Sequence, residues 1–307
     1  MAQIRPFHGV RPLDELAAQI IAPPYDVLSE EEARTIAEPN PKSFLHVTRP
    51  EVDLAPSEDA HGPAAHAKAR QNLDDFIAQG WMVQDDAPCF YLYSQTWRDR
   101  TQTGLMAACS VAEYDAGQIK RHELTRPDKE QDRVDNMSAL DAQPGLVFLA
   151  YRDRSDAVRE AIKLASALSP AWSVTTDDGV THSLTVINNA PIVEQLTEAF
   201  GGLDALYIAD GHHRSAAASR VCAARAGAGQ SGWFLAGLFP DSELEVLAYN
   251  RVVRDLNGQT PSEFMKALGE HFIVSPTSTA RPQRRGRWTM YLTGQWFELM
   301  ARDGVVD

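Results

Sequence analysis

Two hairpin signatures constrain the fold of this chain most. Phe90–Trp97 is rich in aromatic side chains, Thr103–Val111 is largely apolar, and a short polar turn separates them. Trp172–Thr176 and Val180–Ile187 flank the turn Asp177-Asp178-Gly179, in which glycine tolerates a positive φ. Each signature predicts two antiparallel strands that are adjacent in a sheet.

Helical segments are mixed with these strands. Ser29-Glu30-Glu31-Glu32 is a capping box that predicts a helix start, and Ala64–Gln79 has helical spacing and is followed by Gly80. Further helices are predicted at Ser155–Ser166, Pro191–Phe200, His212–Arg225 and Pro261–Phe272. Further strands are predicted at Leu146–Ala150, Ala205–Ile208, Trp233–Phe239, Leu244–Val252, Trp288–Leu292 and Gln295–Leu299. The pattern predicts an α+β (mixed α/β) fold in a single large domain, 1–307.

Charge and composition narrow the classes of function. The chain has 307 residues, and 29 Lys and Arg against 42 Asp and Glu give a net charge of 29 − 42 = −13. Such a balance does not attract phosphate backbones or anionic lipid, so we expect neither a nucleic-acid nor a membrane partner. Three cysteines without a C-x-x-C spacing argue against disulfides and structural zinc. With no apolar run of about 18 residues, the protein is expected to be soluble and cytoplasmic.

The densest polar cluster lies between a predicted strand and a predicted helix. A helix start offers unpaired amides and a positive dipole, so an anion can bind there. Gly211 allows close approach of a phosphate, Arg214 offers a bidentate fork, and Asp210 can hold a metal ion. The candidate cofactor-binding residues are Asp210, Gly211, His212, His213, Arg214 and Ser215. In the alternative interpretation, Asp210 only caps the helix and the histidines face solvent.

Two other segments carry candidate site residues. The charged stretch Lys120–Arg133 is either a solvated face or the lining of a site. Two prolines in Ala22–Val27 stiffen the chain and present a carboxylate that could take a proton from a hydroxyl, unless the segment is an ordinary turn. The candidate residues are Tyr25, Asp26, His122, Glu123, Thr125, Lys129 and Arg133. Lys42, His46 and Arg49 are either anion ligands or a strand edge.

Several motifs together resemble a bacterial family, domain of unknown function 1015. They are Ile4-Arg-Pro-Phe7, Ala22–Val27, Asn40–His46, Lys120–Thr125, Lys129–Arg133 and Ala209–Arg214. This family is similar to the ParB/sulfiredoxin-like superfamily, in which a G-x-x-R box at a helix start binds nucleotide phosphates. Gly211-His-His-Arg214 matches that box. The resemblance implies a ParB/sulfiredoxin-like core around 1–50 and 200–255, with an inserted α+β region around 60–200.

The resemblance also implies a function. An archaeal free serine kinase of this superfamily uses ADP and has a similar Asp-Gly-His-His-Arg run. By analogy, Asp26 would deprotonate a substrate hydroxyl while His212 and His213 help to hold the transferring phosphate. ADP or ATP and Mg²⁺ are the expected cofactors, with Asp210 and Glu123 as metal ligands. The family's pattern continues to a Pro-Lys-Ser-Thr segment that is absent here, so this chain is expected to lack the family's C-terminal segment.

Two alternatives to a small-molecule kinase remain open. One is a nucleotide-binding or nucleotide-hydrolysing switch without transferase activity. The other is a metal-dependent hydrolase built on His122, Glu123, Asp210 and His212.

Overall fold

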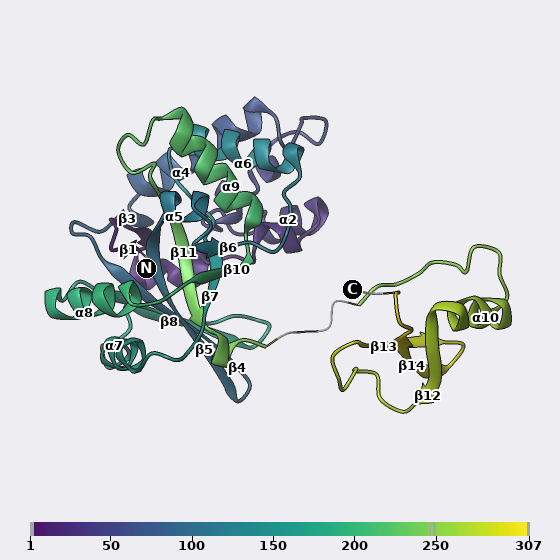
Figure 1. The fold of residues 1–307 in the computed structure, drawn as a ribbon. Coiled ribbons are helices and arrows are strands. Elements are labelled where there is room, and N and C mark those ends of the chain that lie inside the picture. Colours follow the sequence, from purple (N-terminus) through teal and green to yellow (C-terminus); the bar gives the residue numbers. More distant parts are fainter. Residues whose placement is uncertain (1–2, 246, 248–249, 306–307) are drawn as a thin grey trace. The chain divides into compact units, whose positions relative to one another are not determined.

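The computed structural model describes residues 3–245, 247 and 250–305 (Figure 1). Internal contacts divide the chain into two compact units, Met1–Leu244 and Glu245–Asp307. The sequence predicts a single domain instead, because no low-complexity linker marks the boundary. Each of the two units contains a sheet of its own.

A large mixed sheet forms the centre of the first unit. Among the described residues it has nine strands in the order β6-β10-β7-β11-β5-β4-β9-β8, and β1 pairs with β5. Two pairs, β6 with β10 and β7 with β11, are parallel, and the others are antiparallel. The strands are β1 (Ile4–Arg5), β4 (Phe90–Trp97), β5 (Arg100–Ser110), β6 (Ile119–Lys120), β7 (Val147–Tyr151), β8 (Trp172–Thr175), β9 (Val180–Ile187), β10 (Leu206–Asp210) and β11 (Trp233–Pro240). Both predicted hairpins, β4–β5 and β8–β9, are confirmed.

Helices accompany this sheet in two groups. α6 packs against both α4 and α9, and α7 packs against α8 (Figure 1). The helices are α1 (Ala17–Ile20), α2 (Glu30–Ala37), α3 (Leu45–Thr48), α4 (Pro63–Ala78), α5 (Val111–Asp115), α6 (Pro127–Leu140), α7 (Asp156–Ser166), α8 (Ala190–Gly201) and α9 (His212–Ala224). The 3-10 turns are η1 (Asp14–Leu16), η2 (Tyr25–Val27), η3 (Pro50–Asp53) and η4 (Asp241–Glu243). A small antiparallel pair, β2 (Val10–Pro12) with β3 (Met82–Gln84), completes the unit.

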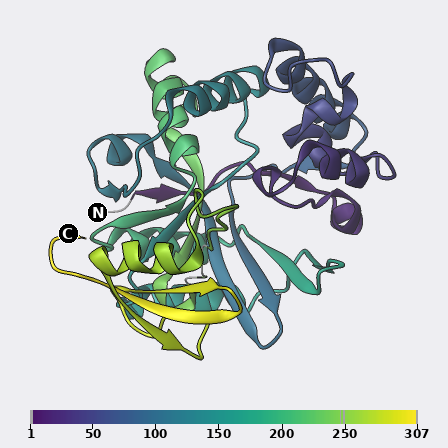
Figure 2. The same ribbon diagram turned by 90° about the vertical axis from the view of Figure 1, so that its right-hand side faces the viewer.

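Local sequence explains several helix starts and stops. The Ser29 side chain accepts from the Glu32 amide and Glu32 reaches back, which confirms the predicted capping box of α2. Ala69, Leu73 and Phe76 of α4 are buried, whereas Ile77 is 41% exposed. α3 packs against α4, and the purple-to-blue helices of this N-terminal part lie together in the view of Figure 2.

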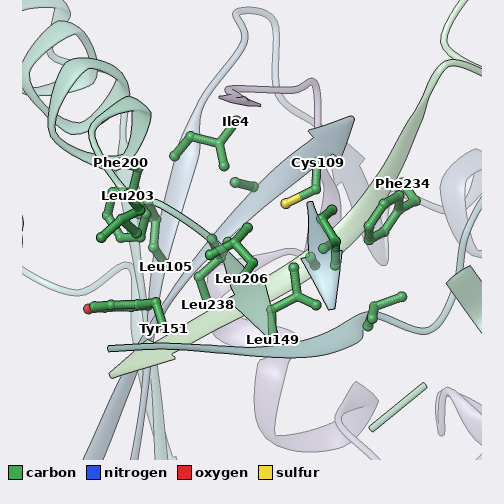
Figure 3. Close-up of a cluster of buried hydrophobic side chains, with 14 of the residues drawn as sticks. Ile4, Leu105, Cys109, Leu149, Tyr151, Phe200, Leu203, Leu206, Phe234 and Leu238 are labelled. Carbon is green, nitrogen blue, oxygen red and sulfur yellow. The ribbon is translucent and has the colours of Figure 1, made fainter. Parts of the chain in front are cut away.

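The main hydrophobic core lies between the sheet and the helices. Leucines from four neighbouring strands, β5, β7, β10 and β11, meet there with Tyr151 and Phe200 (Figure 3). These leucines are Leu105, Leu149, Leu206 and Leu238. Burial of this apolar surface favours the folded sheet, at about 25 cal/mol for each Å². Because β10 and β11 pair with β6, β7 and β5, strands from the predicted core and from the predicted insertion share one sheet.

The second unit is a small sheet with one described helix. α10 (Pro261–His271) is followed directly by β12 (Phe272–Thr277), and β13 (Arg287–Leu292) and β14 (Gln295–Ala301) complete the order β12-β14-β13. β13 and β14 confirm the strands predicted at Trp288–Leu292 and Gln295–Leu299. The prediction of a strand at Leu244–Val252 is wrong for the described residues of that range, because they form no strand. Residues 246 and 248–249 lie outside the described part.

Candidate functional site

The start of α9 carries the residues of the predicted phosphate site. β10 ends at Asp210, and Gly211 forms the N-cap of α9 with φ of 93°. A Cβ on Gly211 would lie 3.2 Å from the Val147 Cα and 3.2 Å from the Arg214 Nε, so only glycine fits without a shift. Within the described residues no side chain caps this helix. Its first amides therefore have no side-chain acceptor at the positive end of the helix dipole, and the residues at this end, Gly211 and His212, are buried.

Asp210 and Arg214 form an ion pair across the first turn. The Arg214 Nη1 donates to the Leu146 carbonyl oxygen at 2.7 Å, which fixes the guanidinium against the start of β7. The alternative in which Asp210 caps α9 is wrong, because Gly211 occupies that position. Ser215 is fully buried, and its hydroxyl donates to the carbonyls of Gly211 and His212. Arg214 uses two of its five N–H donors in these bonds, so others remain for a ligand.

His212 is buried in a cluster that the β6–α6 loop completes. Its side chain is 5% exposed, and its ring lies edge-on to the His122 ring with centroids 4.5 Å apart. Its Nδ1 is 3.5 Å from the Glu123 Oε2, and its buried Nε2 has no hydrogen-bond partner in the described chain. Burial, and then the neighbouring His122, lower the pKa of His212. The neutral imidazole therefore predominates at pH 7, and the alternative of solvent-facing histidines is wrong for His212.

His213 is oriented by the same loop. Its Nε2 accepts from the Arg126 amide at 3.1 Å, so its neutral form carries the proton on Nδ1. Further along the loop, the Thr125 hydroxyl donates to the Glu130 Oε2 at 2.8 Å. Lys129 is exposed on α6. The predicted residues of this stretch thus divide between loop and helix, and His122 and Glu123 are the ones that approach His212.

On its other flank, the start of α9 meets the N-terminal segment. A small pocket, about 20 Å³ in volume, has Tyr25 from η2, Arg133 from α6 and Arg214 from α9 in its lining. The Arg133 guanidinium lies 4.8 Å from the centroid of the Tyr25 ring. The rest of the lining is Thr48, Asn136, Met137, Pro144 and Gly145. Asp26 follows Tyr25 in the same turn and is exposed.

Arg49 holds the turn that carries Tyr25 and Asp26. Its Nη1 donates to the carbonyls of Tyr25 at 2.6 Å and Leu28 at 2.7 Å, and its Nε pairs with the buried Glu51. The strand-edge interpretation of this region is wrong, because Leu45–Thr48 is helical. Arg49 therefore contacts the backbone on both sides of Asp26.

Two other candidate anion ligands also have partners within the protein. The Lys42 Nζ donates to the Gln19 Oε1 at 2.8 Å. The His46 Nδ1 lies 2.8 Å from the Asp53 Oδ1. Neither residue lines the pocket beside Arg214.

Metal binding would depend on a few oxygens at this site. Among the residues that the structure describes, no three His, Cys, Asp or Glu side chains converge in a way that could hold a metal ion. Asp210 and Glu123 are exposed carboxylates near the start of α9. One or two carboxylates, completed by phosphate oxygens and water, are the usual Mg²⁺ environment in nucleotide sites. Of the two predicted ligands, Asp210 is ion-paired with Arg214 and Glu123 lies beside His212.

A family model described as "Protein of unknown function (DUF1015)" matches residues 4–307. The chain belongs to this family. No curated protein and no solved structure matches it. Of the helices in the described ranges of this DUF1015 chain, none combines the length and apolar character needed to cross a membrane.

Sequence reasoning missed part of the pocket in this DUF1015 chain. Asn136 and Met137 line it from α6, and that helix was not predicted because its many charges resemble a solvated loop. The signal was the spacing of Arg133, Met137 and Leu140, which places them on one helix face. Pro144 and Gly145 lie in a loop whose place no local pattern indicates.

Proposed function

We propose that this protein is a nucleotide-dependent small-molecule kinase that phosphorylates a hydroxyl such as that of free serine. The observation that carries the proposal is that Tyr25, next to Asp26, lines one pocket with Arg133 and Arg214. Asp26 is therefore one residue away, along the chain, from a residue that shares a pocket with Arg214 of α9. The resemblance to ParB/sulfiredoxin-like kinases supports the same assignment.

Each residue has a role that follows from its surroundings. The amides at the start of α9 and the remaining donors of Arg214 would bind the transferring phosphate. Asp26 is exposed and would accept the proton of the attacking hydroxyl. His212 is neutral, and its unpartnered Nε2 can donate or accept a hydrogen bond without adding charge. Mg²⁺ bound with the phosphates at Asp210 and Glu123 would neutralise developing negative charge.

A product assay tests this function. The protein is incubated with Mg²⁺, ADP or ATP and a panel of hydroxyl amino acids, and phosphorylated products are measured by mass spectrometry. We expect product with at least one acceptor. Asp26→Asn should lower the rate at least about 100-fold, since general-base catalysis contributes at least that much.

The matched control is Asp75→Asn, which removes an exposed carboxylate on α4. This variant should keep the wild-type rate. Absence of product with every acceptor would contradict the kinase. Nucleotide binding or hydrolysis without acceptor dependence would favour the switch protein instead.

A further inference from the structure

A large cleft beside α9 takes no part in the function proposed above. Its volume is about 1090 Å³, which matches the upper end of ligand-binding cavities. It follows α9 beyond the phosphate-type pocket along one helix face, formed by Ala218, Val221 and Arg225. Met137 and Pro144 line both cavities, so the two adjoin.

The walls of the cleft are largely apolar. Side chains from the N-terminal strand region, the residue before α3, and α4, β3, α6, α9 and β11 contribute to them. The large apolar members are Phe7, Phe44, Leu73, Met82, Val221 and Phe234. Such a surface suits the planar or aliphatic body of an organic molecule.

One uncompensated charge lies in this cleft. The Arg5 guanidinium stacks 4.1 Å from the Trp233 ring centroid and donates to the Gln230 Oε1. In the described part of the chain no carboxylate lies within ion-pair distance of Arg5, and burial lowers its pKa. The second arginine, Arg225, is neutralised by Asp141. In a chain with a net charge of −13, a half-buried cation without an acidic partner is unusual and favours an anion.

We propose that this cleft is a binding site for an organic anion, with its acidic group on Arg5 and its apolar body against the Phe7 and Phe234 walls. Arg5 belongs to the Ile4-Arg-Pro-Phe7 motif, and this motif has no role in the proposed kinase mechanism. The inference is independent of the proposed kinase activity, because no residue of that mechanism contacts Arg5.

Two fluorescent probes test the proposal on the full chain. Anilinonaphthalene sulfonate has an aromatic body and a sulfonate, and phenylnaphthylamine has a similar body without the charge. We expect saturable binding of both dyes at one equivalent. Arg5→Gln should weaken the sulfonate dye about tenfold, the effect of one lost charge-assisted hydrogen bond, and leave the neutral dye within about twofold.

The chain provides a matched control in Arg98, which stacks 4.2 Å from the Trp97 ring centroid outside the cleft. Arg98→Gln should bind both dyes as the wild type does. Val221→Trp fills the cleft and should weaken both dyes. Thermal unfolding of each variant verifies that it is folded. Equal affinity of Arg5→Gln and wild type for the sulfonate dye, or undiminished binding to Val221→Trp, would overturn the proposal.

Discussion

Gly211 combines two constraints at the start of α9. Its φ of 93° is unfavourable for other residues, and an added Cβ would crowd the Val147 Cα and Arg214 Nε. Gly80 has φ of 67° but has nothing within 4 Å of an added Cβ. A substitution at Gly80 therefore measures the cost of the positive φ alone, without crowding. We expect Gly80→Ala to cost about 1–2 kcal/mol in free energy of unfolding, and Gly211→Ala to cost more. Urea unfolding measures both, and equal losses would contradict the crowding.

His212 links the site to pH. Its folded-state pKa lies below the ordinary value of 6.5, so the unfolded chain binds the proton more tightly. Its contribution to stability is therefore complete above about pH 6.5 and decreases as the pH falls below that value. A histidine NMR titration should place the His212 midpoint below 6.5. A midpoint at or above 6.5 would contradict the buried neutral imidazole.

At the scale of elements, η2 depends on Arg49. The backbone carbonyls of Tyr25 in this turn and of Leu28 just after it accept from one guanidinium, which itself pairs with the buried Glu51. Arg49→Gln should therefore increase amide exchange in residues 22–30, measured by hydrogen exchange with mass spectrometry. Arg70→Gln, which removes a similar side-chain clamp from the Leu140 carbonyl, should leave 22–30 unchanged. Unchanged exchange in Arg49→Gln would show that the turn holds without it.

Elements with strong local signals were predictable from sequence. The β4–β5 and β8–β9 hairpins and the capped helix α2 each carry turn or cap residues that act within a few positions. β12 was missed because it follows α10 without a turn, and its Pro276 is unusual within a strand. The proximity of Tyr25 to Arg133 and Arg214 depends on packing between distant segments, which no local pattern contains.

At the scale of the whole molecule, every candidate site residue lies within Met1–Leu244. This unit contains the large sheet and the main core. A chain ending at Leu244 should therefore unfold cooperatively and bind nucleotide within about twofold of the full chain. Circular dichroism during heating and calorimetric titration measure these properties. A shortened chain without cooperative unfolding would show that Glu245–Asp307 is needed for the fold.

The central claim is that the start of α9 binds a phosphorylated ligand through Arg214, and calorimetric titration of ADP with Mg²⁺ tests it most directly. Arg70 is the matched control, because it also pairs with a carboxylate four residues away, Asp74, and donates to a distant backbone carbonyl. The account predicts saturable binding by the wild type and by Arg70→Gln, with affinity at least about tenfold weaker in Arg214→Gln. No binding by the wild type, or equal affinity in the two variants, would contradict it.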